Sequence, residues 1–492
     1  MKRRSFIKIT TAGTVPLILP KAVLKGMDLQ LPSSGLESQF VTPPYSARPQ
    51  GFWFWMNGNI TKDGISRDLE AMDEAGFGGV LNMNVADGIP AGPVRYDSDT
   101  WHEMMKHSLR TLKEHNMMMV SYNCGGWSSG GGPWISPELS MKKIVWSELH
   151  VQGPNPAFKG KLSQPATLHD YYRDIAVLAF PTPKEEGAGS KNSGFRLENW
   201  KVKAGIENLL MQYSFPQPDT RVAGPDEVIN SDQIVDLSSE MGGDGQLQWE
   251  MPEGQWTILR FGYTTTGKKP AQAPEGGIGL ECDKLSSEAT TYHWNQMVGR
   301  IMNDAGSLTG DTLISIEVDS FEAGPQNWTQ GFGEEFEKAH GYKLLRYLPC
   351  ITGRVIDSVD KSERILWDFR RTIADLFTKN YYGTFADLCH KNKMKFSIEP
   401  YGPTGYFDRY SVAAQADIPM GEIWVDRYDA YHWASPKLAS SAAHANGYQV
   451  VGNESFTAAF HSSGWENDPY SLKNIGDYML LQGVNRLIFH NT

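Results

Sequence analysis

The 492-residue sequence is poor in cysteine and contains no long apolar run. Its four cysteines are widely spaced and form no C-x-x-C pair: Cys124, Cys282, Cys350 and Cys389. This pattern excludes a zinc ribbon and a disulfide scaffold, and leaves one or two isolated bridges open. No stretch of about 18 uninterrupted apolar residues occurs, so the sequence is not that of an integral membrane protein.

Basic residues are outnumbered, with 46 Lys and Arg against 57 Asp and Glu and a net charge of −11. No block of Lys and Arg follows the first few residues, so a nucleic-acid partner is not expected. The composition of 40% hydrophobic and 21% charged residues suits a protein with a buried core. The length predicts two or three ordinary domains, or one large barrel that carries an insertion.

Several catalytic motifs are also missing. The sequence has no H-E-x-x-H, no G-x-x-x-x-G-K and no dinucleotide-binding loop. The segment Gly126–Gly130 fits G-x-S-x-G, but a nucleophile elbow needs a helix that begins at the serine. Gly131, Gly132 and Pro133 follow instead, so a serine hydrolase is disfavoured.

The N-terminus has the features of a twin-arginine export signal. Arg3 and Arg4 precede a mildly apolar run over residues 9–20. We predict a signal peptide over residues 1–25 and a linker over residues 26–50. An ordinary basic N-terminus is the alternative, since no clean A-x-A cleavage site is present. A signal of this kind predicts export to the periplasm.

Eight β-rich runs alternate with helical periodicity along most of the chain, and this rhythm predicts a (β/α)8 TIM-like barrel over residues 51–150 and 285–492. The predicted strands are Phe52–Met56, Val80–Val85, Met117–Tyr122, Leu313–Val318, Lys395–Ile398, Ile418–Trp424, Gln449–Val451 and Arg486–Phe489. No helical pattern follows the eighth run, which indicates either an unusual closure of the barrel or a truncated gene product.

The rhythm is interrupted after the third strand. Pro137 is well placed to open a helix, and residues 151–284 then show short β-like pieces with little helical period. These pieces are Ile175–Phe180, Gln233–Leu237 and Trp256–Tyr263. They predict an inserted all-β module, which is either a sugar-binding module or only a packing partner of the barrel.

Acids, amides and an indole gather at the predicted strand ends, where barrel enzymes carry their chemistry. The candidates are Asn57, Asn123, Trp127, Asp319, Glu322, Glu399, Glu422 and Glu454. Hydrolysis of a glycosidic bond needs one protonated carboxyl group and one ionised carboxylate. For each acid the alternative role is that of a salt-bridge partner in a loop. Glu317, which lies inside the fourth predicted strand, can be a core residue. Asn57 and Asn123 can equally satisfy loop backbone groups.

Several segments resemble glycoside hydrolase family 106, the α-L-rhamnosidases. The resemblance rests on residues 55–61, the Cys-Gly-Gly-Trp loop of residues 123–135, and the segment Gly279–Leu285. Asp319–Glu322, Pro419–Glu422 and Asn453–Phe456 resemble active-site segments of that family in the same order. The resemblance spans about residues 50–492, although family members are usually much longer.

The resemblance implies an inverting α-L-rhamnosidase with a calcium ion near the sugar and no organic cofactor. Glu322 matches the general acid and Glu454 the general base, while Glu422 is a further essential carboxylate that contacts the ion or the sugar. Asn57, Asn123, Trp127, Asp319, Glu399 and Glu422 are the expected substrate-binding residues. Inversion predicts a separation of roughly 6.5–9.5 Å between the two catalytic carboxyl groups.

We therefore expect an exported enzyme that releases terminal α-L-rhamnose from a rhamnose-containing oligo- or polysaccharide. One alternative is a catalytically silent glycan-binding protein, which the intact acids disfavour and the missing last helix favours. The second alternative is an exo-glycosidase for another sugar.

Overall fold

The computed structural model describes residues 33–127, 129–184, 196–208, 217–402, 406–427, 430–464 and 466–490. The chain divides into two compact units, Met1–Ala47 and Arg48–Thr492. The described part of the first unit consists of helix α2 (Ser33–Val41) and the 3-10 turn η1 (Tyr45–Ala47). The predicted signal peptide and the first residues of the predicted linker lie outside the described residues.

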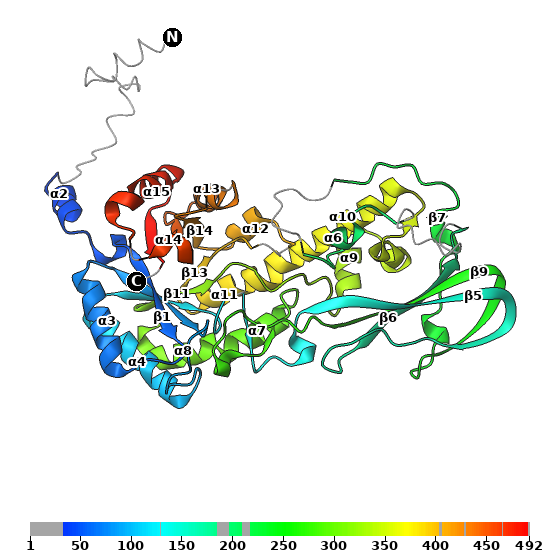
Figure 1. Ribbon diagram of the computed structural model, residues 1–492, viewed down its shortest axis with the longest axis horizontal. Helices are drawn as coiled ribbons and strands as arrows, with labels where there is room; N and C mark the ends of the chain where they lie inside the picture. Colours follow the sequence, from blue (N-terminus) through cyan, green and yellow to red (C-terminus); the bar gives the residue numbers. More distant parts are fainter. Residues whose placement is uncertain are drawn as a thin grey trace, which may run out of the picture. The chain divides into compact units, whose positions relative to one another are not determined.

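The second unit contains a closed barrel of eight parallel strands, as the sequence predicts (Figure 1). In chain order they are β1 (Gln50–Met56), β2 (Gly79–Val85), β3 (Met118–Tyr122), β11 (Leu313–Val318), β13 (Lys395–Ile398), β14 (Ile418–Trp424), β15 (Gly452–Thr457) and β16 (Arg486–Phe489). The barrel closes where β1 pairs with β16, with Gln50 opposite Ile488 and Gly51 opposite Phe489.

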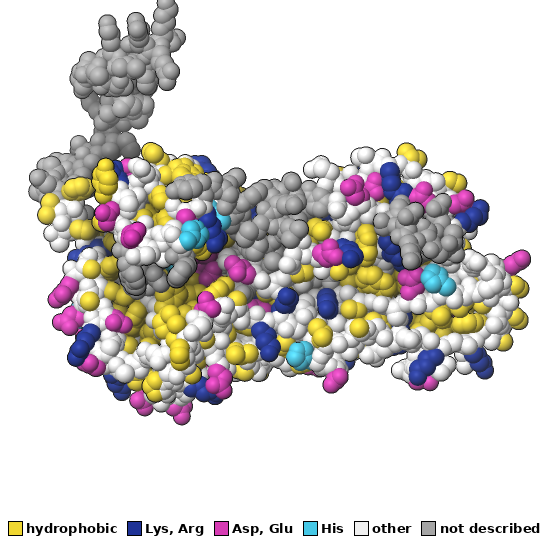
Figure 2. Space-filling model, in the orientation of Figure 1, with side chains coloured by type: hydrophobic (Ala, Val, Ile, Leu, Met, Phe, Trp, Pro, Cys, Tyr) yellow, Lys and Arg dark blue, Asp and Glu magenta, His cyan; other side chains and the backbone are white. Residues whose placement is uncertain are grey.

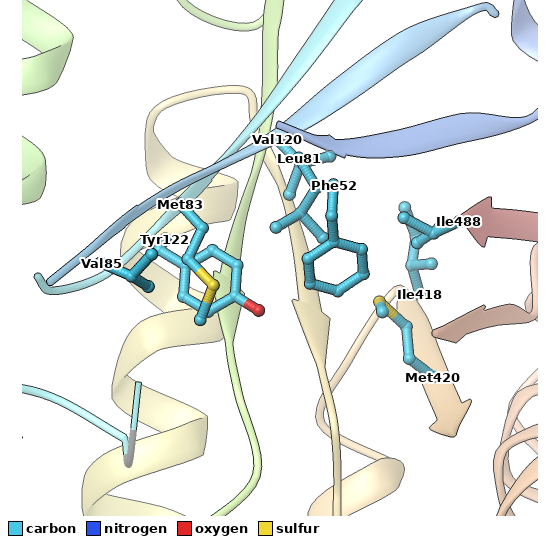
Figure 3. Close-up of a cluster of buried hydrophobic side chains, with 9 residues drawn as sticks. All are labelled: Phe52, Leu81, Met83, Val85, Val120, Tyr122, Ile418, Met420 and Ile488. Carbon is cyan, nitrogen blue, oxygen red and sulfur yellow. The ribbon is translucent and has the colours of Figure 1, made fainter. Parts of the chain in front are cut away.

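The interior of the barrel is filled by side chains from alternate strand positions, because successive residues of a strand face opposite sides. Figure 3 shows these side chains from β1, β2, β3, β14 and β16 pointing toward one another. The cluster comprises Phe52, Leu81, Met83, Val85, Val120, Tyr122, Ile418, Met420 and Ile488, each at most 5% exposed. Layers of bulky residues of this kind make the barrel a packed core.

Helices connect most of the strands. They are α3 (Lys62–Glu74), α4 (Asp99–Glu114), α7 (Ser287–Gln296), α8 (Val298–Ala305), α9 (Phe332–His340), α10 (Val359–Leu376), α11 (Thr384–Lys391), α12 (Arg409–Ala413), α13 (Ala430–Ala445), α14 (Phe460–Ser463) and α15 (Pro469–Gln482). Helix α3 is capped by Thr61 and buries Ile65, Leu69 and Met72, which have the i, i+4, i+7 spacing of an amphipathic helix. Among the described residues, no helix is both long and apolar enough to cross a bilayer.

The helical run from Val359 to Lys391 is interrupted by a π-helical segment. Residues Phe377–Gly383 form the π-helix η9 between α10 and α11. Two consecutive aromatic residues of this segment, Tyr381 and Tyr382, are both fully buried. Single π-helical turns of this kind often occur near functional sites.

The seventh strand was predicted at the wrong residues. It spans Gly452–Thr457 rather than Gln449–Val451, because the apolar residues precede the strand and its own sequence, Gly-Asn-Glu-Ser-Phe-Thr, is mostly polar. Asn453 and Glu454 consequently lie within the strand and not after its end.

The region after β3 also differs from the prediction. Pro137–Leu139 form a single 3-10 turn, η2, instead of a helix, and the 20-residue strand β5 (Lys142–Lys161) follows. It joins β6 (Arg173–Pro181), β8 (Val235–Asp236) and β9 (Gln246–Thr265) in a separate antiparallel sheet of order β5-β9-β6-β8, whose long strands run side by side in Figure 1.

A separate all-β module over residues 151–284 is not confirmed. The sheet begins nine residues earlier, at Lys142, and the interval contains the short helix α6 (Trp200–Lys203). The sheet also belongs to the same compact unit as the barrel. All four cysteines are buried free thiols, so no bridge joins them.

Candidate active site

A cavity of about 530 Å³ opens at the C-terminal ends of the barrel strands. Its wall includes residues at or just after the ends of all eight strands, among them Met56, Val85, Tyr122, Asp319, Glu399, Trp424, Thr457 and His490. Six acids line it: Asp87, Asp319, Glu322, Glu399, Glu422 and Glu454. Figure 2 shows a patch of hydrophobic side chains over the barrel with acidic side chains along its margin.

Glu322 is held at the cavity wall by two hydrogen bonds. The indole Nε1 of Trp127 donates to its Oε2 over 3.2 Å, and the Ser320 hydroxyl donates to its Oε1 over 3.2 Å. Desolvation and then the negative charge of Asp319 raise the pKa of Glu322 above its usual value, although both hydrogen bonds oppose the shift. Glu322 is exposed to the cavity, so a group with raised pKa is accessible to a ligand.

Glu454 is only 8% exposed and accepts a hydrogen bond from the Thr457 hydroxyl. Burial and the charge of Asp319 raise its pKa to about 8, while a hydrogen bond shared with Glu399 favours its ionised form. Its neighbour across the β14–β15 pair is Glu422. Two carboxyl groups this close cannot both ionise freely, so their titrations are linked.

Glu399, Glu422 and Asp319 complete the acidic cluster. Burial, followed by the charges of the neighbouring acids, raises the pKa values of Glu399 and Glu422 well above normal. Tyr122 donates its phenolic proton to Asp319 Oδ2 over 2.8 Å. Below this cluster lies Glu317, which is fully buried; burial and then Asp319 raise its pKa well above normal.

Two of the predicted binding residues do not line the cavity. Asn57 adopts a left-handed conformation with φ 46° at the turn after β1, and its Nδ2 donates to the Ile89 carbonyl over 2.7 Å. Asn123 is 1% exposed and donates to the Ser129 carbonyl and to the Tyr381 hydroxyl. Both amides therefore bond groups of nearby loops, as the alternative interpretation holds, and their expected contact with sugar hydroxyls stays a prediction. The other six predicted residues line the cavity.

The family model described as alpha-L-rhamnosidase, glycoside hydrolase family 106, matches residues 41–492. The chain belongs to this family. The resemblance drawn from the sequence is thereby confirmed.

Two relatives show how far the similarity extends. A solved rhamnosidase from Novosphingobium sp. PP1Y superimposes with a TM-score of 0.80 at 27% identity, covering 93% of this chain and 56% of that protein. A curated protein of Formosa agariphila, provisionally named a beta-glucuronidase, is 43% identical over 468 residues, which are 94% of this chain and 38% of that relative. The chain thus spans about two fifths to just over half of the length of these relatives.

The cavity of this family member also contains aromatic and cationic residues that are not among the candidates named from the sequence. They are Phe52, Phe54, Tyr122, Tyr401, Trp424, Arg427, His432 and His490. The Arg427 guanidinium carbon lies 3.3 Å from the centre of the Trp424 ring, and burial lowers the pKa of His490 to about 4, so this imidazole is neutral. The period-two pattern of Phe52, Phe54 and Met56 on β1 is the signal that could have found the apolar wall.

The expected calcium site can be compared with the residues present. Carboxylate oxygens are the ligands that Ca²⁺ prefers, and the acidic cluster around Glu422 supplies them. Glu399 Oε1 in this cluster is buried without a hydrogen-bond partner. Within the described parts of the chain, however, no three or more acid, histidine or cysteine side chains are already placed as a metal-binding group. The donors fit calcium in kind, without a preassembled site.

Proposed function

We propose that this chain hydrolyses a terminal glycosidic bond in the cavity at the end of the barrel. The observation that carries the proposal is the convergence of Glu322 and the acidic cluster on one aromatic-lined cavity. A glycosidase needs carboxyl groups in two protonation states, and environments that push pKa values apart provide them.

Glu322 is the proposed general acid. It is reachable from the cavity, and its raised pKa favours the protonated form that can donate to a leaving oxygen.

Glu454 is the proposed general base. Because its own pKa is also raised, this role requires Glu399 and Glu422 to retain the protons of the cluster, which the hydrogen bond from Glu399 to Glu454 favours. The cluster titrates as a unit, so the pH profile reports shared rather than individual pKa values.

The proposed reaction is a single displacement with inversion. Glu322 protonates the leaving oxygen while Glu454 takes a proton from water on the opposite face of the sugar. We expect Glu322→Gln and Glu454→Gln each to lower kcat by about 10³-fold, with product anomers followed by NMR in the first minutes. A first product of retained configuration would contradict the single displacement.

The proposed sugar is α-L-rhamnose at the end of an oligo- or polysaccharide. The family description and the rhamnosidase of similar fold support this choice. The direct test is turnover of 4-nitrophenyl α-L-rhamnoside, followed by rhamnose oligosaccharides if the small substrate is not cleaved.

A uronic acid is the second candidate sugar, because one observation favours it. Arg427 places a guanidinium in the cavity wall, and guanidinium groups bind carboxylates with two parallel hydrogen bonds. The Formosa agariphila relative, by its provisional name, fits this alternative. Turnover of 4-nitrophenyl β-D-glucuronide in preference to the rhamnoside, lost in Arg427→Gln, would establish the uronide.

A glycan-binding protein without activity can be distinguished from an enzyme by measuring binding and turnover together. Calorimetric titration with rhamnose oligosaccharides that bind and stay intact would identify a protein without catalysis. The intact acids Glu322, Glu422 and Glu454 favour an active enzyme.

Calcium, with Glu422 as a ligand, is also proposed. A divalent cation in the acidic cluster would favour the ionised carboxylates and so supply the charge compensation that a base needs. We expect a chelator to lower kcat at least tenfold, because the carboxyl groups of the cluster retain their protons when no cation is bound. Added Ca²⁺ should restore kcat. Activity that is unchanged in excess chelator would contradict the metal.

We further propose that the chain is exported to the periplasm by the signal over residues 1–25. Fractionation of cells that express the wild type and an Arg3→Lys/Arg4→Lys variant tests this, with the variant expected to remain in the cytoplasm.

A further inference from the structure

The segment Gly279–Leu285 carries part of the family resemblance, yet none of its residues lines the cavity. Three of its side chains, those of Glu281, Cys282 and Lys284, are fully buried. Burying a charged pair is costly unless every polar group is matched, so the pair formed by Glu281 and Lys284 requires a structural or functional reason.

The pair binds both backbone polar groups of one residue, Gly130. Lys284 Nζ donates to Glu281 Oε2 over 2.6 Å and to the Gly130 carbonyl over 2.8 Å. The Gly130 amide donates in turn to Glu281 Oε2 over 3.1 Å, and the Cys282 amide donates to the Gly130 carbonyl over 3.1 Å. The ion pair therefore fixes the position of the peptide units on both sides of Gly130.

Gly130 is confined from the other side as well. Its φ is 142°, and a Cβ there would lie 2.6 Å from Asn123 Nδ2 and 2.9 Å from both His293 Nε2 and the Tyr381 hydroxyl. The preceding residue, Ser129, has φ 110°, a strained value for a residue with a side chain. Strain of this kind persists only where the surroundings hold the backbone in place.

The confined residue ends the loop that carries Trp127. The Trp127 backbone is held by paired hydrogen bonds with Ala271 of 3.0 and 3.1 Å, and its indole reaches Glu322. Gly130 thus lies only three residues after Trp127, whose indole donates the hydrogen bond to the proposed acid Glu322.

We propose that the buried Glu281–Lys284 pair is a positioning device, which fixes Gly130 and through the loop holds Trp127 against Glu322. The catalytic consequence rests on the proposed function, whereas the loop-fixing role does not. Loosening the loop weakens the hydrogen bond from Trp127. Because that bond favours the ionised form of Glu322, its loss raises the pKa of the acid and moves the alkaline limb of the kcat/KM profile to higher pH.

The chain offers a matched control. Lys203 and Glu363 form a second buried Lys–Glu pair of 2.6 Å that does not line the cavity. We would compare Glu281→Gln/Lys284→Met with Lys203→Met/Glu363→Gln, since neutralising both partners avoids leaving one buried charge unpaired. Amide hydrogen exchange over residues 123–132 reports the loop directly, with no need for turnover.

We expect exchange in this loop to rise about tenfold in the first variant and to stay unchanged in the control. In the first variant we also expect kcat to fall about tenfold, with a smaller change in KM, and the alkaline limb to move to higher pH. In a Trp127→Phe background the same double substitution should move the limb no further, because the bond through which it acts is absent.

Equal exchange of residues 123–132 in both pair variants would overturn the proposal, as would a pH shift that adds to that of Trp127→Phe. If the double variant does not fold, Gly130→Ala displaces the same contacts without altering a charge, and the same changes are expected. If the wild type cleaves no glycoside, the proposed function fails while the exchange comparison still decides the positioning role.

Discussion

The negative charge of Asp319 acts on both proposed catalytic carboxyl groups. It raises the pKa values of both Glu322 and Glu454. Asp319→Asn removes this charge and keeps an oxygen that can accept the hydrogen bond from the Tyr122 hydroxyl. Both limbs of the kcat/KM profile should therefore move to lower pH, since the base and the acid then ionise more easily. Rates measured across the pH range test this, with Glu322→Gln as the reference for a loss of about 10³-fold.

A fall in rate without movement of either limb would contradict this role for Asp319. The variant is expected to lose less activity than Glu322→Gln, because neither proposed proton-transfer group is removed.

At the same scale, the acids among the candidate residues line the cavity, whereas the two amides do not. Three of these acids follow predicted strands: Asp319, Glu322 and Glu399. A carboxylate at the end of a strand is an unusual feature, and it can be recognised from the sequence alone. Asn57 and Asn123 also follow strands, but whether an amide faces the cavity or its own loop depends on backbone angles such as the left-handed φ of Asn57. Arg427 follows β14, and nothing in its neighbours predicts that it stacks on Trp424.

Among the elements, helices α4 and α8 are joined by a titratable contact. His102 of α4 is 3.2 Å from Asp97 and bonds Asp304 of α8. Asp304 and then Asp97 raise the pKa of His102 from 6.5 to about 9. Stability from the protonated imidazole is fully present below about pH 6.5 and is lost as the pH rises through about 9.

We expect this loss to be on the order of 2 kcal/mol in the free energy of unfolding, given the partial burial of the ring. Urea unfolding at pH 6 and pH 9.5, wild type beside His102→Gln, measures it. The prediction fails if the difference between the two proteins is the same at both pH values.

Elements were predictable where their own residues carry the pattern. The strands β11, β13, β14 and β16 begin and end at the predicted residues, because each carries apolar or β-branched residues of its own. β15 was displaced by three residues, since its polar sequence is stabilised by its neighbours β14 and β16 and not by its own propensity. The strand β5 was missed because most of its second half is exposed, and its pairing with β9 defines it.

On the scale of the whole molecule, the antiparallel sheet is joined to barrel connections by buried polar contacts. Asp283 accepts hydrogen bonds from Lys142 at the start of β5 and from Thr329, at 2.8 and 2.7 Å. Arg354 bonds Glu148 of β5 over 2.7 Å. Contacts of this kind predict that the sheet and the barrel unfold together.

Asp283→Asn tests this coupling. It leaves the ammonium group of Lys142, which is 3% exposed, buried without a counter-charge, and should cost about 3 kcal/mol in the free energy of unfolding. Asp360→Asn, which breaks the exposed pair with Arg364, should cost less than about 0.5 kcal/mol. Because Asp283 links the start of β5 to Thr329 in the connection after the barrel strand β11, circular dichroism and tryptophan fluorescence should still report one coincident urea transition, at a lower urea concentration. If the sheet instead melted first in a transition of its own, with the barrel transition unmoved, the sheet would be an independent module after all.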